Sequence, residues 1–257
     1  MSYLSWSNEQ NVATIKLNRP PANALSSGVI KELAEVLNEL EPNEEIRVIL
    51  IHGEGRFFSA GADIKEFTSV QSGEEFAKLG TNGQELFERM ENFPKPIIAA
   101  IHGAALGGGL ELDMDCHFRL ASETAKLGLP ELQLGIIPGF AGSQRLTRYV
   151  GAAMAAEMMF TSDPITGIEA VQYGLANHAY REEELLEKAQ AMAEKIAKKS
   201  PLSLKATIEL LNYSKTKEFY QGVKREAELF GEVFHSEDAK EGIAAFLEKR
   251  KPVFKGK

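Results

Sequence analysis

Two glutamates in apolar surroundings are the strongest candidates for chemistry in this sequence. Glu111 lies between two leucines, two residues after the glycine run 107–109, and Glu131 lies between Pro130 and another leucine. An apolar environment raises the pKa of a carboxyl group, and two carboxyl groups in different environments can divide the roles of general acid and general base. The residue types alone leave open an electrostatic role for Glu111 at a helix N-terminus and a surface loop position for Glu131.

Two segments of small residues could bring backbone N–H groups to a ligand. Residues 59–63 read Ser-Ala-Gly-Ala-Asp, and residues 106–109 read Leu-Gly-Gly-Gly. Glycine and alanine leave the backbone N–H unshielded, and a helix that begins directly after such a loop directs further N–H groups toward the same place. Two N–H groups that converge on one oxygen would form an oxyanion hole. The alternative is close packing of a helix on a strand, which also requires small residues.

Other kinds of site have little support in the sequence. The five histidines show no spacing typical of metal ligands, so no metal site is expected. The single cysteine, Cys116, cannot form an internal disulfide and indicates a reducing compartment. Ser143 stands in the sequence Ala-Gly-Ser-Gln rather than in a nucleophile elbow, so a hydrolase triad is not expected either.

The candidate residues follow apolar segments that alternate with helical patterns. Residues 46–51 and 97–101 are continuous apolar runs, typical of strands buried on both faces, and each leads into a glycine-rich loop. The recurrence of strand, glycine loop and helix predicts an α/β layered core in which loops at one edge build the site. Helices are predicted over about 30–40, 76–90 and 143–150, and further strands at 3–6, 12–17, 118–121 and 126–128.

The last third of the chain reads differently. From Thr166 onward the pattern is mostly helical, residues 166–169 form a capping-box sequence, and three helices with no strand among them are predicted beyond Pro201. A final segment of about sixty residues is too small to hold a core alone. We therefore expect it to pack on the first domain or on a neighbouring subunit.

Composition and charge describe an ordinary globular protein. The chain has 257 residues, is 44% hydrophobic and 26% charged, and carries a net charge of −8. This balance argues against disorder and against a nucleic-acid-binding surface. The N-terminus lacks the features of a secretory signal, and the longest weakly polar run, residues 97–110, is shorter than the roughly 20 residues that span a bilayer. We expect a cytoplasmic protein without a membrane partner.

Five blocks, taken in order and spacing, strongly resemble the enoyl-CoA hydratase (crotonase) family. The likeness runs from residues 18–20 to residues 246–250, which is nearly the whole chain. The blocks are SAGADIKE at 59–66, KPIIAAIHG at 95–103, LGGGLEL at 106–112, PEL at 130–132 with GIIPG at 135–139, and QRL at 144–146.

The resemblance implies a fold and an assembly. The expected fold is α/β, a crotonase-like spiral of repeated ββα units over residues 1–195, followed by a C-terminal helical trimerisation segment over residues 196–257. Members of the family are typically homotrimers or homohexamers built as dimers of trimers. The unpartnered C-terminal helices expected above suit that arrangement.

The resemblance also implies an activity: syn addition of water to a trans-2-enoyl-CoA to give a 3-hydroxyacyl-CoA, as in fatty-acid β-oxidation. The residues that match the oxyanion hole are Ala62 and Gly108, and those that match the paired acids are Glu111 and Glu131. Gly139 would orient Glu131 or the water. Coenzyme A belongs to the substrate, and no metal or redox cofactor is expected. The expected substrate contacts are Ala22, Ala60, Ala62, Asp63, Ile64, Lys65, Gly108, Pro130, Gly139, Phe246 and Lys249.

Two of these contacts belong to a basic tail. Residues 249–257 contain five Lys or Arg and no acid, despite the acidic total. By resemblance, Phe246 and Lys249 would reach the nucleotide end of coenzyme A from an adjacent subunit. A solvated tail is the alternative.

Departures from the family pattern leave other functions open. Phe140 places a bulky ring near the site, and Asp113 and Asp115 make the stretch after Glu111 unusually acidic. Both features bear on acyl-chain preference more than on reaction type. The alternatives are a Δ3,Δ2-enoyl-CoA isomerase or another acyl-CoA lyase on the same scaffold, and a non-catalytic acyl-CoA-binding or RNA-binding relative. The net charge of −8 disfavours RNA.

Overall fold

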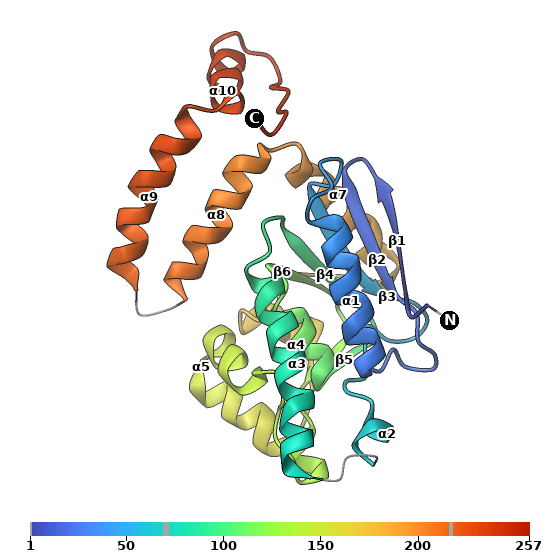
Figure 1. Cartoon of the computed structure of the whole chain (residues 1–257). Coiled ribbons are helices and arrows are strands. Elements are labelled where there is room, and N and C mark those ends of the chain that lie inside the picture. The colour runs from blue at the N-terminus through green and yellow to red at the C-terminus, as the bar shows by residue number, and fades with distance from the viewer. Residues whose placement is uncertain (1, 69–71, 216–217) are drawn as a thin grey trace.

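The chain is built around a six-stranded sheet and a smaller three-stranded sheet (Figure 1). The computed structural model describes residues 2–68, 72–215 and 218–257. The larger sheet has the order β1-β2-β3-β4-β6-β9, in which β1 is antiparallel to β2 and every other pair is parallel. Its strands are β1 (Leu4–Glu9), β2 (Val12–Leu17), β3 (Val48–Gly53), β4 (Ile97–Ile101), β6 (Phe118–Ser122) and β9 (His178–Tyr180).

The smaller sheet has the order β5-β7-β8. Its strands are β5 (Ala104–Leu106), β7 (Lys126–Gly128) and β8 (Ile165–Thr166). Strand β4 is thus followed by β5 and the helix α4 (Gly108–Met114), and β6 is followed by β7, the short 3-10 helix η1 (Glu131–Leu134) and α5 (Gly142–Thr161). This succession confirms the α/β fold of repeated ββα units.

Three strands were not expected from the sequence, namely β5, β8 and β9. Each has only two or three residues, which is too short for an alternating pattern to emerge. The helix expected over 143–150 is the first half of α5, because Gly151, with a φ of +78°, interrupts the helical backbone there. The capping box is present as expected, with Thr166 and Glu169 bonding to each other's backbone at the start of α6 (Gly167–Gln172).

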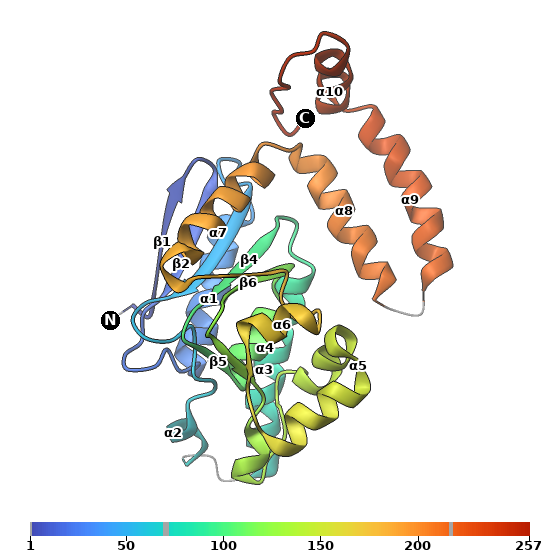
Figure 2. The same cartoon turned by 180° about the vertical axis from the view of Figure 1, so that it is seen from behind.

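Helices cover both faces of the larger sheet (Figures 1 and 2). On one face lie α1 (Ser27–Leu40) and α3 (Gly73–Glu91), whose apolar stripes join the main core. On the other face, α7 (Glu182–Ala197) packs Leu185 and three alanines against strand residues such as Val48 and Ile98. Alanines every fourth residue let the helix approach the sheet closely, because they present little side-chain bulk.

The C-terminal segment stands beside this core as three helices, α8 (Pro201–Ser214), α9 (Phe219–Phe234) and α10 (Glu237–Leu247). No strand lies among the described residues after Pro201, as expected. The Asn212 side chain of α8 donates to Glu91 O at 3.2 Å and to Asn92 Oδ1 at 2.8 Å, which ties α8 to the end of α3. The boundary between residues 195 and 196 remains a prediction.

The basic tail is anchored rather than loose. The buried Asp238 accepts hydrogen bonds from the backbone N–H groups of Lys255 and Gly256, at 2.6 and 3.0 Å. Arg47, from the core, donates to Phe254 O at 2.7 Å. The tail therefore folds back along α10 and toward the sheet. In the part of the chain that the structure describes, no helix is long and apolar enough to cross a membrane.

Candidate active site

A cavity of about 710 Å³ opens between α3, the N-terminus of α4 and the segment around η1. Its wall contains both glutamates singled out above, Glu111 and Glu131, and both small-residue loops. Most of the remaining lining is apolar or glycine. The residues that complete it are Ile64, Ala77, Leu79, Gly80, Thr81, Gln84, Pro130, Leu134, Gly135, Ile136, Ile137, Pro138, Gly139 and Phe140.

The backbone N–H groups of Ala62 and Gly108 lie close together at this cavity. A Cβ atom on Gly108 would lie 3.3 Å from Ala62 N, and a Cβ on Gly61 would lie 3.4 Å from Gly108 N. Gly61 has a φ of +100° and its absent side chain leaves room for Leu106 O, so only glycine fits this approach of the two loops. Gly108 is the first residue of α4, and the first N–H groups of a helix have no intrahelical acceptor. Two backbone nitrogens this close together could both donate to one oxygen, which is what an oxyanion hole requires.

Glu111 is held at the cavity wall by backbone donors. Its side chain projects from the first turn of α4 and is 1% exposed. The N–H groups of Phe140 and Gly142 both donate to Glu111 Oε1, at 2.8 and 2.7 Å. Burial, together with the nearby charge of Glu131, raises the pKa of Glu111 to about 7, even though the two N–H donors lower it. This carboxyl group can therefore exchange a proton near neutral pH.

Glu131 faces the same cavity from the first residue of η1. Its Oε1 lies 2.9 Å from the position that a Cβ on Gly107 would occupy, so glycine at 107 makes space for the carboxyl group. Its Oε2 is buried and accepts no hydrogen bond from the described residues. Burial raises the pKa of Glu131. The two carboxyl groups are thus a pair in which one can hold a proton while the other is ionised.

The turn 139–142 supplies the donors to Glu111, and α3 holds this turn. Gln84 of α3 donates to Gly139 O at 2.9 Å. Ala141 has a φ of +67°, which turns the next N–H, that of Gly142, toward Glu111. A Cβ on Gly142 would lie 2.7 Å from Glu111 Oε1, so a side chain there would displace the carboxylate. These backbone contacts could not be predicted from the sequence.

Arg145 secures the same turn from behind. Its Nη1 donates to Phe140 O at 3.2 Å, and its Nη2 bonds Glu91 Oε2 at 3.1 Å. Its Nε also forms an ion pair with Asp115, which is fully buried. Burial raises the pKa of Asp115 to about 8, while the charge of Arg145 acts in the opposite direction. Arg145 belongs to the QRL block of the family resemblance, but that block by itself predicted no role for it.

Several expected site residues line the cavity and several do not. Those that line it are Ala60, Ala62, Ile64, Gly108, Glu111, Pro130, Glu131 and Gly139. Asp63 instead pairs with Arg19 and accepts a hydrogen bond from Lys65 N, which caps the short helix α2 (Ile64–Phe67). Ala22 O accepts from Ala60 N at 2.9 Å. Lys65 is exposed on α2 and is not part of the lining.

Helix α10, which contains Phe246 and ends two residues before Lys249, lies at the far end of the molecule from α2 (Figure 1). Phe246 is 82% exposed at the end of α10. Within one chain these two residues do not meet the cavity, so the expected contact with a ligand stays a prediction about an adjacent subunit. Asp113 and Asp115 do not line the cavity either; both are buried behind Glu111 in α4 and the residue that follows it.

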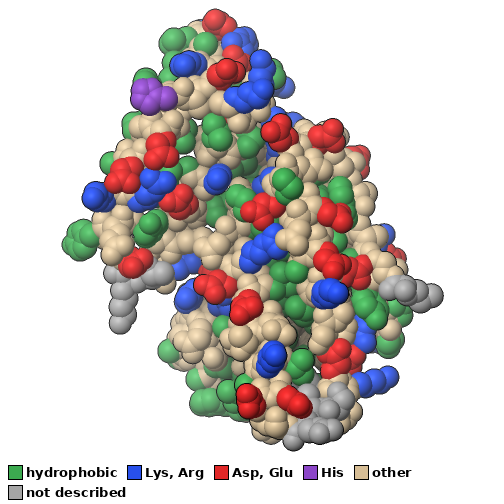
Figure 3. Space-filling view, viewed as in Figure 1, with side chains coloured by type: hydrophobic (Ala, Val, Ile, Leu, Met, Phe, Trp, Pro, Cys, Tyr) green, Lys and Arg blue, Asp and Glu red, His purple; other side chains and the backbone are tan. Residues whose placement is uncertain are grey.

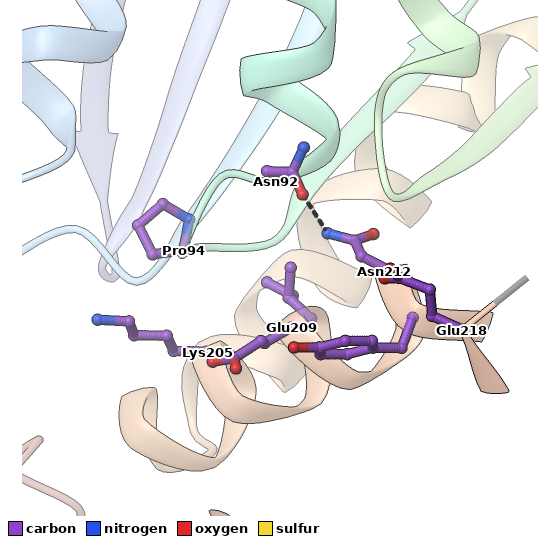
Figure 4. Close-up of a pocket in the computed structure, with 8 residues that line it drawn as sticks. Asn92, Pro94, Lys205, Glu209, Asn212 and Glu218 are labelled. Carbon is purple, nitrogen blue, oxygen red and sulfur yellow. Dashed lines mark hydrogen bonds between the residues drawn. The ribbon is translucent and has the colours of Figure 1, made fainter. Parts of the chain in front are cut away.

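A separate cavity of about 410 Å³ lies between α8 and the segment that joins α3 to β4 (Figure 4). Asn92 and Pro94 line it from the core side, and Lys205, Glu209 and Asn212 line it from α8. It contains none of the expected site residues. Among the described residues, no group of three or more His, Cys, Asp or Glu side chains is arranged to hold a metal ion.

Replacing Glu111 by glutamine should make the free energy of unfolding depend less on pH. The pKa of Glu111 is raised from 4.5 to about 7 in the folded state, so its contribution is present at low pH and is lost as the pH rises through 7. The difference corresponds to about 3 kcal/mol. Between pH 4 and pH 8, we expect the free energy of unfolding of wild type to fall by up to about 3 kcal/mol more than that of E111Q. Urea unfolding at both pH values measures it, and equal losses in both proteins would contradict it.

Several known proteins are similar to this chain. The sequence model of the family described as Enoyl-CoA hydratase/isomerase matches residues 7–257. A protein of Bacillus subtilis (strain 168) named "Probable enoyl-CoA hydratase" is 58% identical over 257 residues, which is 100% of both chains. A "Short-chain-enoyl-CoA hydratase" of Clostridium acetobutylicum is 41% identical over 245 residues, covering 95% of this chain and 94% of the relative.

Solved structures agree with the sequence comparison. The crystal structure of an enoyl-CoA hydratase from Bacillus anthracis superposes with a TM-score of 0.94 at 37% identity and covers 100% of both chains. One from Geobacillus kaustophilus gives a TM-score of 0.93, also at 37% identity, over 100% of this chain and 99% of the other.

Proposed function

This chain belongs to the enoyl-CoA hydratase/isomerase family and is an enzyme, and on that premise we propose that it hydrates trans-2-enoyl-CoA thioesters to 3-hydroxyacyl-CoA. The observation that carries the proposal is one cavity with two carboxyl groups of raised pKa beside two neighbouring backbone N–H groups. Relatives named as hydratases over the full length of the chain support the same activity.

The N–H groups of Ala62 and Gly108 would bind the thioester oxygen. The Cα=Cβ bond is electrophilic only because it is conjugated to this carbonyl. When water attacks Cβ, the π electrons move toward the carbonyl and negative charge builds on its oxygen. Fixed N–H donors stabilise that charge, and losing one such donor typically costs about 10²–10³ in rate.

Glu111 and Glu131 would move the protons. The ionised carboxylate of the pair takes a proton from water as the new bond from oxygen to Cβ forms. The protonated partner gives a proton to Cα as the enolate returns to a thioester. One water is added, and the pair ends with the same total of protons. We propose syn addition, because both carboxyl groups would act from one wall of the cavity.

The proposed reaction needs no redox cofactor, because water addition leaves the overall oxidation level unchanged, and coenzyme A enters as part of the substrate. We propose no nucleic-acid partner. The net charge of −8 supports this, and basic and acidic side chains are interspersed over the face seen in Figure 3 rather than gathered into a basic field.

We also propose that the C-terminal helices mediate assembly into a trimer or a dimer of trimers. Large apolar side chains are exposed on α9 and α10. A monomeric protein rarely exposes so many of them to solvent. The most exposed are Tyr220 at 85%, Phe246 at 82%, Phe230 at 78% and Leu247 at 73%. Sedimentation of the purified protein tests the assembly.

Purified protein should consume crotonyl-CoA with loss of the ultraviolet absorbance of the conjugated enoyl thioester. Mass and retention of the product then distinguish hydration, which adds one water, from isomerisation, which leaves the mass unchanged. A product of unchanged mass would favour the isomerase alternative. No product at high enzyme concentration, with acyl-CoA binding retained, would indicate the non-catalytic alternative.

A further inference from the structure

The ring of Phe140 separates the cavity described above from a second one. The second cavity has a volume of about 550 Å³ and lies between α1 and α3. Three residues line both cavities, namely Ala62, Leu79 and Phe140. Ala62 carries one of the two oxyanion donors proposed above, so the partition stands directly beside the site of reaction.

Glycines on two helices make the seat for this ring. A Cβ on Gly83, in the middle of α3, would lie 2.4 Å from Phe140 ring atoms, and a Cβ on Gly108 would lie 3.0 Å from Phe140 Cε2. Phe87 contacts the ring edge-on, with the centroids 5.2 Å apart and the planes at 76°. Glycine inside a helix costs stability relative to alanine, so a glycine that admits a ring marks a packing requirement.

The backbone of Phe140 is held as firmly as its ring. Its N–H donates to Glu111 Oε1 at 2.8 Å, and its carbonyl accepts from Arg145 at 3.2 Å. The neighbouring Gly139 O accepts from Gln84 at 2.9 Å. Moving the ring out of the partition by moving the main chain would break the contacts that position Glu111. The partition is therefore a fixed wall rather than a flap.

The second cavity suits a hydrocarbon chain. Seven of its fourteen lining residues are apolar, and all the polar ones except Ser26 are exposed or half-buried. The aliphatic residues are Leu25, Ile30, Ala34, Ala62, Leu79 and Leu86. An alkyl chain that reached this space would leave water for an apolar environment, which favours binding by roughly fourfold for each methylene buried.

We propose that the Phe140 side chain limits the length of the acyl chain that the enzyme accepts. With the thioester oxygen at Ala62 and Gly108 and the reacting carbons between the glutamates, an acyl chain that continues toward α3 meets the ring and stops. Short chains fit in front of it, and the aliphatic space behind it stays closed. This inference rests on the proposed function and names the substrate class within it.

Phe140→Ala should open the partition while keeping the backbone donor to Glu111. With trans-2-enoyl-CoA substrates of C4, C8, C12 and C16, we expect the ratio of kcat/KM for C12 over C4 to rise at least about tenfold, which burial of two or three methylenes supplies. Phe140→Leu, a smaller change in an apolar wall, should raise the ratio by less. It serves in place of Phe140→Ala if that variant fails to fold.

Ile137→Ala is the matched control. Ile137 lines the same cavity from the segment after η1, is 76% exposed, and does not line the second cavity. Its truncation should leave the ratio of C12 to C4 within about twofold of wild type, since it opens no new space. A ratio that moves with Ile137→Ala but not with Phe140→Ala would place the chain along the outer wall and overturn the proposal.

Binding separates this inference from the proposed reaction. Calorimetric titration of butanoyl-CoA and dodecanoyl-CoA, which cannot be hydrated, should show a gain in relative affinity for dodecanoyl-CoA in Phe140→Ala. That gain with no turnover of any enoyl-CoA would refute the hydratase function and keep the chain-length wall. Turnover of crotonyl-CoA with unchanged relative affinity and an unchanged C12 to C4 ratio would refute the wall and keep the hydratase.

Discussion

Replacing Glu111 by glutamine is expected to lower kcat for crotonyl-CoA hydration by about 10²–10⁴, the usual contribution of a positioned general acid or base. Glutamine can still accept the hydrogen bonds from Phe140 and Gly142 that hold Oε1 in place, but it cannot take or give a proton. The fold should therefore survive while the proton transfer is lost. Initial rates under saturating substrate, together with the melting temperature, measure both quantities.

Glu131→Gln is expected to reduce turnover to a similar degree, because each member of a coupled pair needs the other. Glu157→Gln is the matched control, since Glu157 is exposed on α5 and does not line the cavity. Wild type should show a bell-shaped pH profile, because one carboxyl group must be ionised and the other protonated. Near-native turnover in either E111Q or E131Q would refute the paired-acid mechanism for this protein.

Replacing Arg145 by methionine should destabilise the fold by about 1–3 kcal/mol, the typical cost of leaving a buried polar group without its partner, because Asp115 has a pKa of about 8 and is largely protonated at pH 7. The substitution leaves Asp115 buried without its only ion-pair partner among the described residues, and it removes the donor to Phe140 O. Because that carbonyl belongs to the turn that holds Glu111, kcat should also fall in the remaining folded protein. Urea unfolding at pH 7 gives the stability change.

Arg148→Met is the control for this experiment. Arg148 also reaches Glu91, at 3.4 Å, but its side chain is 47% exposed, whereas that of Arg145 is 9% exposed. Exposed ion pairs contribute little, so we expect a change below about 1 kcal/mol. Equal changes in the free energy of unfolding for the two substitutions would mean that the buried contacts of Arg145 stabilise the fold no more than the exposed contact of Arg148.

Much of the fold could be predicted from local patterns. Runs such as 97–101 are apolar throughout because both faces of their strands are covered, and the stripe of α1 reflects its single buried face. Local sequence patterns did not predict elements that are short or that form only because a neighbouring strand is present. Strand β9 has three residues and exists because β6 offers it a parallel partner.

In the candidate site, too, some features could be predicted from the sequence and others could not. The two glutamates and the two small-residue loops could be selected from the sequence, because their residue types are unusual for their surroundings. The contacts around Phe140 could not, since they join residues far apart in the chain: Gly83 admits the ring, Glu111 binds its N–H, and Arg145 binds its carbonyl. The glycines at 80 and 83, three apart within a helical pattern, were the one available signal.

By itself the sequence predicted the longer strands and many of the helices in their order, the family, and the two candidate carboxyl groups. All three follow from residue type and spacing along the chain. Only the tertiary structure decided that these carboxyl groups share one cavity, that burial brings the pKa of Glu111 to about 7, and that a ring divides the space beside them. A pKa and a cavity depend on the atoms within a few ångströms, and packing chooses those atoms from distant parts of the chain.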